Sequence, residues 1–523
     1  MVGSKGSNGP VKTAKVNIPS KSGDYDEWYR YMVQTAGLMD NRYPIRGMDV
    51  WLPYGMKARS LLDGLIRGEM ERTDHDEVSL PTLVPDYLLD KESKLVSRLK
   101  HARELGVDGS ELRLDEEEKG GGFSREVYWV RHAGETKLDL PLFLRPTSET
   151  AMYTMFKHWI RSHVDLPLKV FQIVNSFRYE KKQTRALLRV REIHFFESHT
   201  AHESEQGATT EIERYLETMS RLFSALKLPY LCTKRPAWDT FPGAWYTIAG
   251  DVVMPDGKTL QAASCHHYLD QWSREFEIKF LDDEGTQKFV HQTTFGMSER
   301  LLGAVVACHG DDRGLLLPPC VAPIQVVVIP IANGERQAAV KEKVHREARR
   351  VGQELKGAGI RCRVDDRNVN PGHKFFDWEI KGVPLRIEIG AKELANGSVT
   401  SWRRGTEKQA KQTFKVNNLV EAVNLELKEV SDEMGRASAK RLEESIKPLP
   451  SFRVEGEGLV FEQPIEKAVY ETPFDGNEKM AEMLERGAGL KFLGYSMESY
   501  EQERACPFTG SLTCNRVILA KTY

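Results

Sequence analysis

The residues of this chain with the clearest chemical potential lie in segment 175–200, NSFRYEKKQTRALLRVREIHFFESHT. Arg178 and Glu180 stand two residues apart in an apolar, strand-like stretch, and a basic polar loop follows them. Beyond the loop, an extended backbone would place Glu197 and His199 on one face of a strand. Charges on a buried strand face are costly unless they meet a charged ligand. The pattern predicts a hairpin that binds an ionic ligand; the alternative, a solvated surface hairpin, is disfavoured because the segment is rich in phenylalanine and aliphatic residues.

This hairpin resembles motif 2 of the class II aminoacyl-tRNA synthetases, with FRYE, a loop, and then LRVRE and FFESHT. Its Glu-x-His ending is similar to that of prolyl-tRNA synthetases of the archaeal and eukaryotic type, and the resemblance extends over about residues 20–523. It implies an α+β multidomain fold with a class II antiparallel-sheet catalytic core, an α/β anticodon-binding domain and a small α+β C-terminal domain. It also implies a homodimer that joins L-proline to tRNA(Pro) through a prolyl-adenylate, with ATP and Mg²⁺ as cofactors.

Adenylate formation needs no general base, because the attacking carboxylate is already ionised. It needs positive charge on the triphosphate, Mg²⁺ and a rigid pocket that holds the reactants in line. Arginine suits this task because its planar fork grips phosphate and carboxylate oxygens in pairs. By position in the motifs, Arg178 is implied to bridge the α-phosphate and the substrate carboxylate, Glu180 to hold the adenine, and Arg300 of GMSER to hold the γ-phosphate. Further implied ATP contacts are Arg189, whose alternative is an ordinary loop arginine, Val190, Gln261, Ser264 and Ser298.

The segment LRPTSET resembles the Thr-x-Glu loop of the same family. In extended backbone Thr147 and Glu149 face the same way, and they could accept both N–H donors of the secondary ammonium of proline. The implied proline pocket consists of Thr147, Glu149, Arg178, Phe195, Glu197, His199 and His266, with Phe241 as a further wall. Phe195 and Phe241 are almost equally compatible with an ordinary core. No metal is expected, because the adjacent residues 265–267 cannot all reach one ion from a strand.

Segment 370–408 resembles the anticodon-binding domain shared by the prolyl, threonyl, histidyl and glycyl enzymes. Carried over by position, Glu379, Arg386, Lys392 and Lys408 are implied to contact the two guanines of the proline anticodon. A carboxylate can accept from guanine N1 and N2, and the cations can donate to O6 and N7. The alternative for each residue is a solvated surface charge.

The elements that must position these groups follow from periodicity and from breaker residues. Helices are expected over 24–39 and 55–73, followed by a β-rich run at 78–85 that Pro81 should confine to a sheet edge or an interface. This pair resembles motif 1, which builds the homodimer interface of the family. The charged, Gly-rich stretch 101–139 is expected to be a mobile connection. We expect four parts: a disordered extension at 1–20, a catalytic domain at 21–322, an anticodon-binding domain at 323–425 and a C-terminal domain at 426–523.

Composition sets the remaining limits. The net charge of −2 means that an RNA partner would need a local basic surface, and no DNA partner or membrane association is expected. Seven scattered cysteines suggest a reducing, cytoplasmic location. Only Cys506 and Cys514 remain where many relatives hold zinc with four cysteines, so structural zinc is not expected. The terminal Tyr523 fits a family habit of ending near the active site.

Two further expectations concern specificity and rival functions. The interval between motifs 2 and 3 is too short for the large editing insertion of bacterial relatives, so alanine and cysteine should be misactivated. The rivals are a threonyl enzyme, which would need a metal ligand set, and a catalytically inert RNA-binding relative. Retention of Arg178, Glu180 and Arg300 argues against the second rival.

Overall fold

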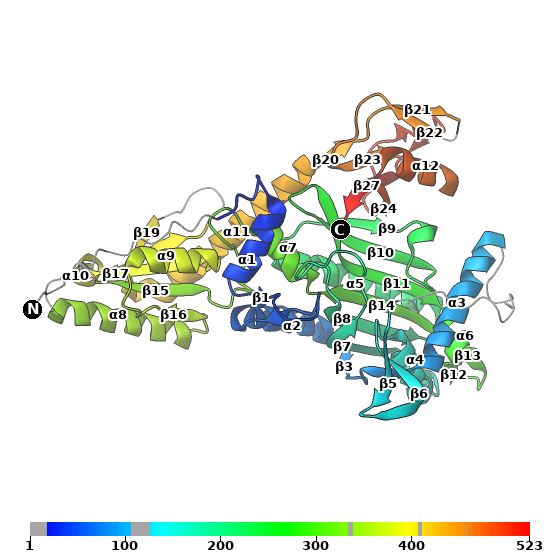
Figure 1. The fold of residues 1–523 in the computed structure, drawn as a ribbon, viewed down its shortest axis with the longest axis horizontal. Coiled ribbons are helices and arrows are strands. Elements are labelled where there is room, and N and C mark those ends of the chain that lie inside the picture. The colour runs from blue at the N-terminus through cyan, green and yellow to red at the C-terminus, as the bar shows by residue number, and fades with distance from the viewer. Residues whose placement is uncertain (1–17, 106–125, 333–337, 406–410, 457) are drawn as a thin grey trace, which may run out of the picture.

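The computed structural model describes residues 18–105, 126–332, 338–405, 411–456 and 458–523. Its centre is an eleven-stranded sheet in the order β20-β23-β27-β24-β9-β10-β11-β14-β8-β7-β3 (Figure 1). Seven strands belong to the predicted catalytic part: β3 (Asp76–Glu77), β7 (Leu168–Phe177), β8 (Glu192–His202), β9 (Leu231–Lys234), β10 (Tyr246–Val253), β11 (Lys258–Leu269) and β14 (His291–Ser298). From β7 to β9 every neighbouring pair is antiparallel, as expected, whereas β3 pairs parallel to β7 at the edge.

Two apolar cores fix the helices against this sheet. One core lies beneath α1 (Tyr25–Thr35), α2 (Pro53–Arg72), α5 (Glu205–Ala225) and α7 (Arg300–His309). The other lies beneath α3 (Asp86–Leu105), α4 (Glu149–Trp159) and α6 (Gln271–Phe276). Side-chain caps set two of the starts, since Asp24 accepts from the Glu27 amide and Ser204 from the Gly207 amide.

The motif 1 prediction is confirmed in outline and corrected in detail. The helix expected at 55–73 is α2, but within the run at 78–85 only β4 (Leu83–Pro85), after Pro81, is a strand, and it belongs to a separate three-stranded sheet. The edge strand β3 of the central sheet precedes the run. The expected mobile connection is wrong for residues 126–139. They enter a hairpin of β5 (Tyr128–Ala133) and β6 (Thr136–Leu144), because a Gly-containing turn joins two strands that pair antiparallel. Residues 106–125 of that stretch lie outside the described residues.

Residues 326–415 form the predicted small α/β unit at one end of the molecule (Figure 1). Its sheet has the order β16-β15-β17-β18-β19 and is parallel in its first three strands. The strands are β15 (Val326–Ile331), β16 (Cys362–Val364), β17 (Leu385–Gly390), β18 (Ser398–Arg403) and β19 (Lys411–Lys415). The helices are α8 (Ala338–Gly357), α9 (Pro371–Ile380) and α10 (Ala391–Asn396).

The C-terminal residues extend the central sheet, which local sequence patterns did not indicate. The long helix α11 (Leu419–Ser445) leads to β20 (Ile446–Pro448), β23 (Val469–Pro473), β24 (Lys491–Ser496) and β27 (Arg516–Thr522), all in the central sheet. Beside them lie α12 (Glu478–Ala488) and two small hairpins, β21 (Phe452–Glu455) with β22 (Gly458–Phe461) and β25 (Arg504–Ala505) with β26 (Leu512–Thr513). The remaining short pairs are β1 (Met39–Asp40) with β2 (Val50–Trp51), and β12 (Lys279–Leu281) with β13 (Gln287–Phe289).

Among the described helices, none is long and apolar enough to cross a bilayer.

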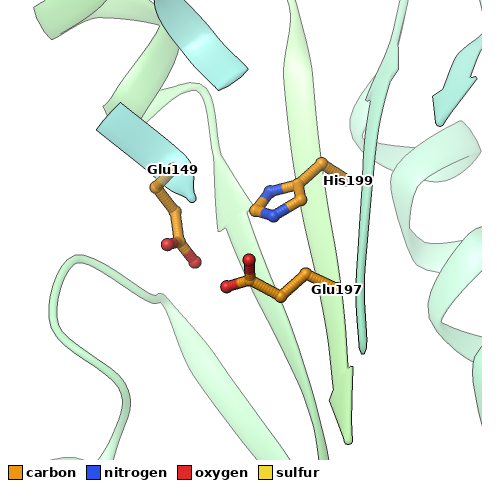
Figure 2. Close-up of side chains that lie close together, drawn as sticks. All are labelled: Glu149, Glu197 and His199. Carbon is orange, nitrogen blue, oxygen red and sulfur yellow. The ribbon is translucent and has the colours of Figure 1, made fainter. Parts of the chain in front are cut away.

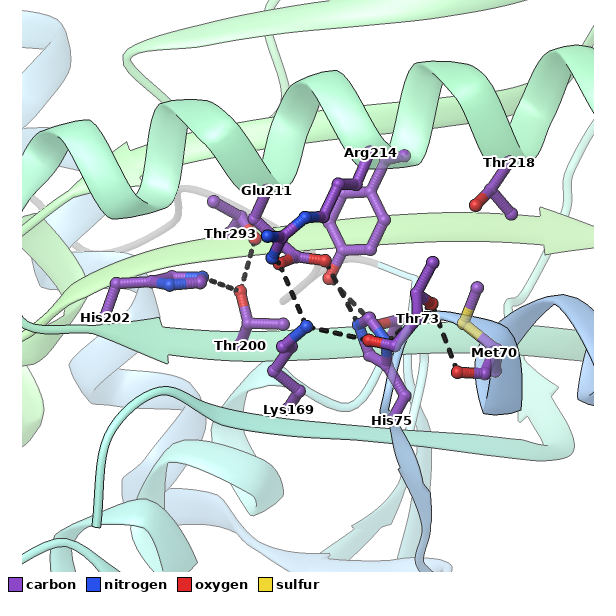
Figure 3. Close-up of polar contacts among 12 residues, drawn as sticks. Met70, Thr73, His75, Lys169, Thr200, His202, Glu211, Arg214, Thr218 and Thr293 are labelled. Atoms are coloured by element: carbon purple, nitrogen blue, oxygen red, sulfur yellow. Dashed lines mark hydrogen bonds and ion pairs between the residues drawn. The ribbon is translucent and has the colours of Figure 1, made fainter. Parts of the chain in front are cut away.

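A buried polar cluster holds the rear of the sheet against α5 (Figure 3). The Glu211 carboxylate of α5 lies 3.1 Å from the Arg214 guanidinium, 3.5 Å from the Lys169 ammonium and 3.6 Å from His75 Nε2. Thr200 of β8 bonds His202 at 2.8 Å. These contacts link α5 and the α2–β3 turn to the rear of β7 and β8.

Six buried histidines make the fold sensitive to acid. Burial lowers the pKa to about 3 for His75, His202, His266 and His309 and to about 4 for His199 and His267, from an ordinary 6.5. Below pH 6.5 these histidines are protonated in the unfolded chain but not in the folded chain. The free energy of unfolding therefore decreases as the pH is lowered from about 6.5 to about 4. Each histidine contributes about 1.4 kcal/mol of loss per pH unit in this window.

We expect the melting temperature to drop steeply between pH 7 and pH 5 when followed by circular dichroism. His202→Gln should make the drop shallower, whereas His158→Gln, at an exposed position on α4, should leave its steepness unchanged. Equal melting temperatures at the two pH values would contradict the neutral state of these histidines.

Candidate functional site

A cavity of about 230 Å³ lies over β8, β11 and β14, beside the N-terminus of α4. It gathers most of the residues predicted from the sequence: Thr147, Glu149, Arg178, Phe195, Glu197, Phe241, Gln261, Ser264, His266, Ser298 and Arg300. These residues come from six separate stretches of the chain, and the antiparallel pairing of the three strands brings those on β8, β11 and β14 together. The predicted proline and ATP contacts therefore share one cavity.

Two arginines form the cationic end of the cavity. Arg178 Nε donates to Pro146 O at 3.0 Å, and Arg300 donates from Nε to Leu188 O at 2.9 Å and from a terminal nitrogen to Gln261 O at 3.1 Å. Burial lowers the pKa of both groups, and burial together with the neighbouring Arg178 charge brings the pKa of Arg300 to about 10. Both remain cationic at neutral pH, so this end is suited to a polyanion such as a triphosphate.

Arg300 reaches the cavity because α7 packs closely on the motif 2 hairpin. The helix starts at Arg300, directly after β14, and Gly303 faces the hairpin one turn later. A Cβ on Gly303 would lie 2.9 Å from Leu187 O and 2.6 Å from a methyl carbon of Leu188. A larger residue there would push the helix, and with it Arg300, away from the cavity.

Three predicted ATP contacts do not line the cavity: Glu180, Arg189 and Val190. They lie on the motif 2 hairpin, and we call this part of the hairpin the rim. Arg189 and Glu180 form an ion pair at 3.3 Å, and both charges act on the Arg300 guanidinium. Val190 is a buried residue, consistent with a predicted contact through its backbone. The rim thus places an anionic and a cationic side chain next to the cationic end of the cavity.

Two carboxylates form the opposite end. Thr147 Oγ1 lies 2.5 Å from Glu149 Oε2 and 2.5 Å from Glu197 Oε1. Glu149 and Glu197 are each only 1% exposed. Burial, and then the charge of Glu197, raises the pKa of Glu149 to about 8. This end is suited to a cation with several N–H donors.

Three residues that support these carboxylates were not among the predicted site residues. Ser148 donates to Glu197 through its amide at 3.1 Å and through its hydroxyl, which in turn accepts from Gln172 Nε2 at 2.6 Å. Tyr268 donates to Glu149 Oε1 at 3.1 Å. A signal existed for Gln172, because a lone amide in the apolar run of β7 requires a buried partner.

His266 and Phe241 build an aromatic wall between the two ends. Their ring centroids lie 4.4 Å apart. Thr247 contacts His266 Nδ1 at 2.9 Å and Ser264 contacts Nε2 at 3.1 Å, and burial lowers the pKa of His266 to about 3. The histidine is therefore neutral and offers a flat, uncharged surface to a ligand.

His199 lies close to the two carboxylates (Figure 2) but does not line the cavity. Its Nδ1 contacts Thr294 Oγ1 at 3.2 Å and Tyr153 Oη at 3.4 Å. Within the described residues, Glu149, Glu197 and His199 are the one group of such side chains whose ligand atoms lie within 4.8 Å of one another. All four carboxylate oxygens already have a hydroxyl neighbour from Thr147, Ser148 or Tyr268, which suits a hydrogen-bonding ammonium better than a metal ion.

In the smaller α/β unit, two of the four predicted RNA contacts come together. Glu379 and Arg386 line one hollow beside Phe375 and Trp402. The Arg386 guanidinium lies 4.0 Å from the Phe375 ring centroid, and its Nε bonds Glu388 at 2.8 Å. Lys392 is exposed on α10 and does not line this hollow, and Lys408 lies outside the described residues.

Comparison with known proteins gives the family. Residues 128–309 match the tRNA synthetase class II core domain (G, H, P, S and T), and residues 325–425 match the anticodon binding domain. A proline–tRNA ligase of Thermococcus kodakarensis is 43% identical over 96% of this chain and 98% of its own length. The corresponding protein of Pyrococcus abyssi is 42% identical over the same shares. The chain belongs to the proline–tRNA ligase family.

Solved structures agree with this assignment. The Giardia lamblia prolyl-tRNA synthetase in complex with prolyl-adenylate has a TM-score of 0.84 at 29% identity, covering 96% of this chain and 99% of that one. The Cryptosporidium parvum enzyme complexed with halofuginone and AMPPNP also scores 0.84, at 26% identity, covering 97% and 99%. The predicted family, the class II core and the α+β multidomain fold are confirmed, and the chain is an AMP-forming ligase of this family.

The chain end of this family member lies beside the motif 2 hairpin. The Tyr523 amide donates to Thr259 O at 3.1 Å. Its ring lies 4.8 Å from the Lys258 ammonium and 5.6 Å from the Arg185 guanidinium. Tyr523 therefore lies near the motif 2 loop, as expected, but it does not line the cavity itself.

Cys506 and Cys514 are both free thiols. Cys506 is 1% exposed and packs in an apolar cluster with Phe474 and Phe492. Two thiols cannot complete a tetrahedral site. Burial raises the pKa of the Cys506 thiol, but hydrogen bonds from the Thr509 hydroxyl and from nearby backbone amides outweigh it and lower that pKa.

We expect the purified protein to contain well below one zinc per chain, measured by elemental analysis after dialysis. Treatment with a chelator should leave its melting temperature unchanged, because the C-terminal core is apolar rather than metal-linked. Stoichiometric zinc, or a lowered melting temperature in the chelator, would contradict this prediction.

Proposed function

We propose that this chain activates L-proline with ATP and transfers it to tRNA(Pro). The observation that carries the proposal is the single cavity with two carboxylates at one end and two arginines at the other. A zwitterionic amino acid spans such a cavity with its ammonium toward Glu149 and Glu197 and its carboxylate toward Arg178. The family assignment selects proline among amino acids.

The reaction then needs positioning more than acid–base chemistry. The proline carboxylate attacks the α-phosphate of ATP, and pyrophosphate leaves. Arg178 neutralises charge where the two reactants meet, and Arg300 holds the departing phosphates. The Glu180–Arg189 rim receives the adenine ring. In the second step a ribose hydroxyl of tRNA attacks the activated carbonyl and AMP leaves.

Mg²⁺ would enter with the nucleotide. Magnesium usually binds one or two carboxylates together with the substrate phosphates. The described carboxylate group with metal-like spacing lies at the ammonium end of the cavity, so the phosphates are expected to supply most of the ligands.

Recognition of tRNA and assembly extend the proposal. Glu379 and Arg386 read the anticodon guanines from their shared hollow, and Lys392 and Lys408 are further contacts. Two copies pair through α2 and the 78–85 segment to give a homodimer. The enzyme works in the cytoplasm. Residues 21–322, 323–425 and 426–523 serve as catalytic, anticodon-binding and C-terminal domains.

Arg178→Ala should abolish proline-dependent ATP–pyrophosphate exchange, with a loss of at least about 10²-fold from removing one preorganised charge. Arg453→Ala is the matched control, because Arg453 is exposed and pairs only locally with Glu455. No exchange by the wild type with proline, together with tight tRNA binding, would favour the catalytically inert alternative.

The interval between the two motifs supports the absence of an editing insertion. Residues 203–290 are filled by α5, α6 and the sheet strands β9, β10 and β11 with their connections. A cavity without a second, hydrolytic site rejects a smaller substrate only by its missing contacts, worth about 1–3 kcal/mol.

We therefore expect alanine and cysteine to support measurable exchange at saturating concentration. Their kcat/KM should be at least about 10- to 200-fold below that of proline. Phenylalanine, whose side chain is larger than that of proline, is the control and should give background exchange. Background values for both alanine and cysteine would refute the expectation.

A further inference from the structure

The hydroxyl of Thr147 poses a proton-counting problem at the carboxylate end of the cavity. It lies 2.5 Å from Glu149 Oε2 and 2.5 Å from Glu197 Oε1. A hydroxyl has a single proton and can donate to only one of these oxygens. An ionised carboxylate has no proton to return. Both contacts are hydrogen bonds only if one of the two glutamic acids is protonated.

The neighbours decide which carboxyl carries the proton. Glu197 receives the Ser148 amide at 3.1 Å and the Ser148 hydroxyl. That hydroxyl is committed as a donor to Glu197, because it already accepts from Gln172, whose own oxygen accepts from the Leu80 amide at 3.1 Å. With Thr147 as a further donor, Glu197 is the ionised member.

Glu149 has a less favourable setting for a negative charge. Its one other hydroxyl neighbour is Tyr268, which donates to Oε1 at 3.1 Å. The proton therefore sits on Glu149 Oε2 and is donated to Thr147, which donates to Glu197. This gives a directed chain from Tyr268 through Glu149 and Thr147 to Glu197.

The charged and titratable groups around Glu149 are consistent with this state. Glu197 of β8 and Glu92 of α3 act on it as like charges, and both oppose its ionisation. The opposing cation is Arg178, while Arg145 acts on Glu197. The remaining groups are Tyr153 of α4 and Tyr268 of β11, whose pKa values burial raises well above normal, and His199, whose pKa burial lowers to about 4.

We propose that the empty site holds one proton on Glu149, shared through Thr147 with Glu197, and that binding of the proline ammonium expels it. This deepens the proposed function and rests on it. The balance is simple: the carboxylic acid and the prolinium ion give a carboxylate–prolinium pair and one proton in the solvent. The secondary ammonium then supplies two N–H donors to the carboxylate end in place of that proton.

Proline binding should consequently weaken in acid. Because burial and Glu197 raise the pKa of Glu149 to about 8, the dissociation constant for proline should rise roughly tenfold for each pH unit below that value. Above about pH 8 it should be flat. The amine of proline stays protonated across this window and adds no dependence of its own.

Calorimetric titration of proline into the full-length protein tests this directly. At pH 7 the binding enthalpy should vary with the ionisation enthalpy of the buffer, with a slope close to one released proton, and the slope should approach zero at pH 9. Binding at pH 7 with zero slope would overturn the inference while leaving the proposed function intact. Absence of proline binding at both pH values would reject both.

Matched variants localise the proton. Glu149→Gln cannot ionise, so any remaining proline binding should release no proton. Tyr268→Phe removes a donor that stabilises ionised Glu149 and should move the pH midpoint upward, with binding retained at high pH. Tyr153→Phe removes a hydroxyl that contacts Thr294 and His199 instead, and should leave the midpoint in place. Proton release by Glu149→Gln equal to that of the wild type would refute the assignment to Glu149.

Discussion

Two arginines and two buried carboxyl groups lie together in one cavity, and the elements around it are arranged to keep them there. Neutral groups do much of this work. Backbone carbonyls of Pro146 and Leu188 fix the arginine Nε atoms, and hydroxyls and amides surround Glu149 and Glu197. A neutral partner orients a charged group without cancelling its charge, so the outer nitrogens and oxygens keep their electrostatic effect on a ligand. Holding charged groups buried in this way lowers the stability of the fold, and favourable contacts in the surrounding scaffold must offset that loss.

The scaffold supplies that stability through a strand with two different faces. On β8 the side chains of Glu197 and His199 point toward the carboxylate end of the site, while those of Ser198 and Thr200 point to the opposite face of the sheet. Ser198 bonds Tyr215 of α5 at 2.8 Å, and Thr200 contacts Thr293 at 2.5 Å. Both faces of the strand carry buried polar side chains. A one-residue shift in the register of β8 would leave several of these side chains without hydrogen-bond partners. The register that places Glu197 opposite Glu149 is therefore fixed from behind.

Local sequence predicted the parts of the site that one strand or loop determines. The alternation in 193–199 identified Glu197 from backbone geometry. Thr147 and Glu149 were identified by the resemblance of LRPTSET to the family loop; the extended backbone expected for them is wrong, because Ser148 adopts a helical conformation and Glu149 opens α4. Gln172 and Tyr268 were missed because their roles depend on which strands become neighbours. The same limit applies to the fold: the helices and the unit at 326–415 follow periodic patterns, whereas β23, β24 and β27 join the central sheet through the pairings of β24 with β9 and of β27 with β11, whose partners lie hundreds of residues apart.

That long-range pairing explains what the C-terminal residues contribute in a chain with only two of the four expected cysteines. β24 pairs with β9, and β27 runs parallel to the start of β11, so the C-terminal part is continuous with the sheet that bears the site. Its last residue is hydrogen-bonded to Thr259, and its ring is held between Lys258 and Arg185, the latter in the motif 2 loop. Arg185 is in turn paired with Asp26 of α1 at 2.5 Å. Tyr523 thus links the first helix, the motif 2 loop and the central sheet, which gives the C-terminal part a structural role.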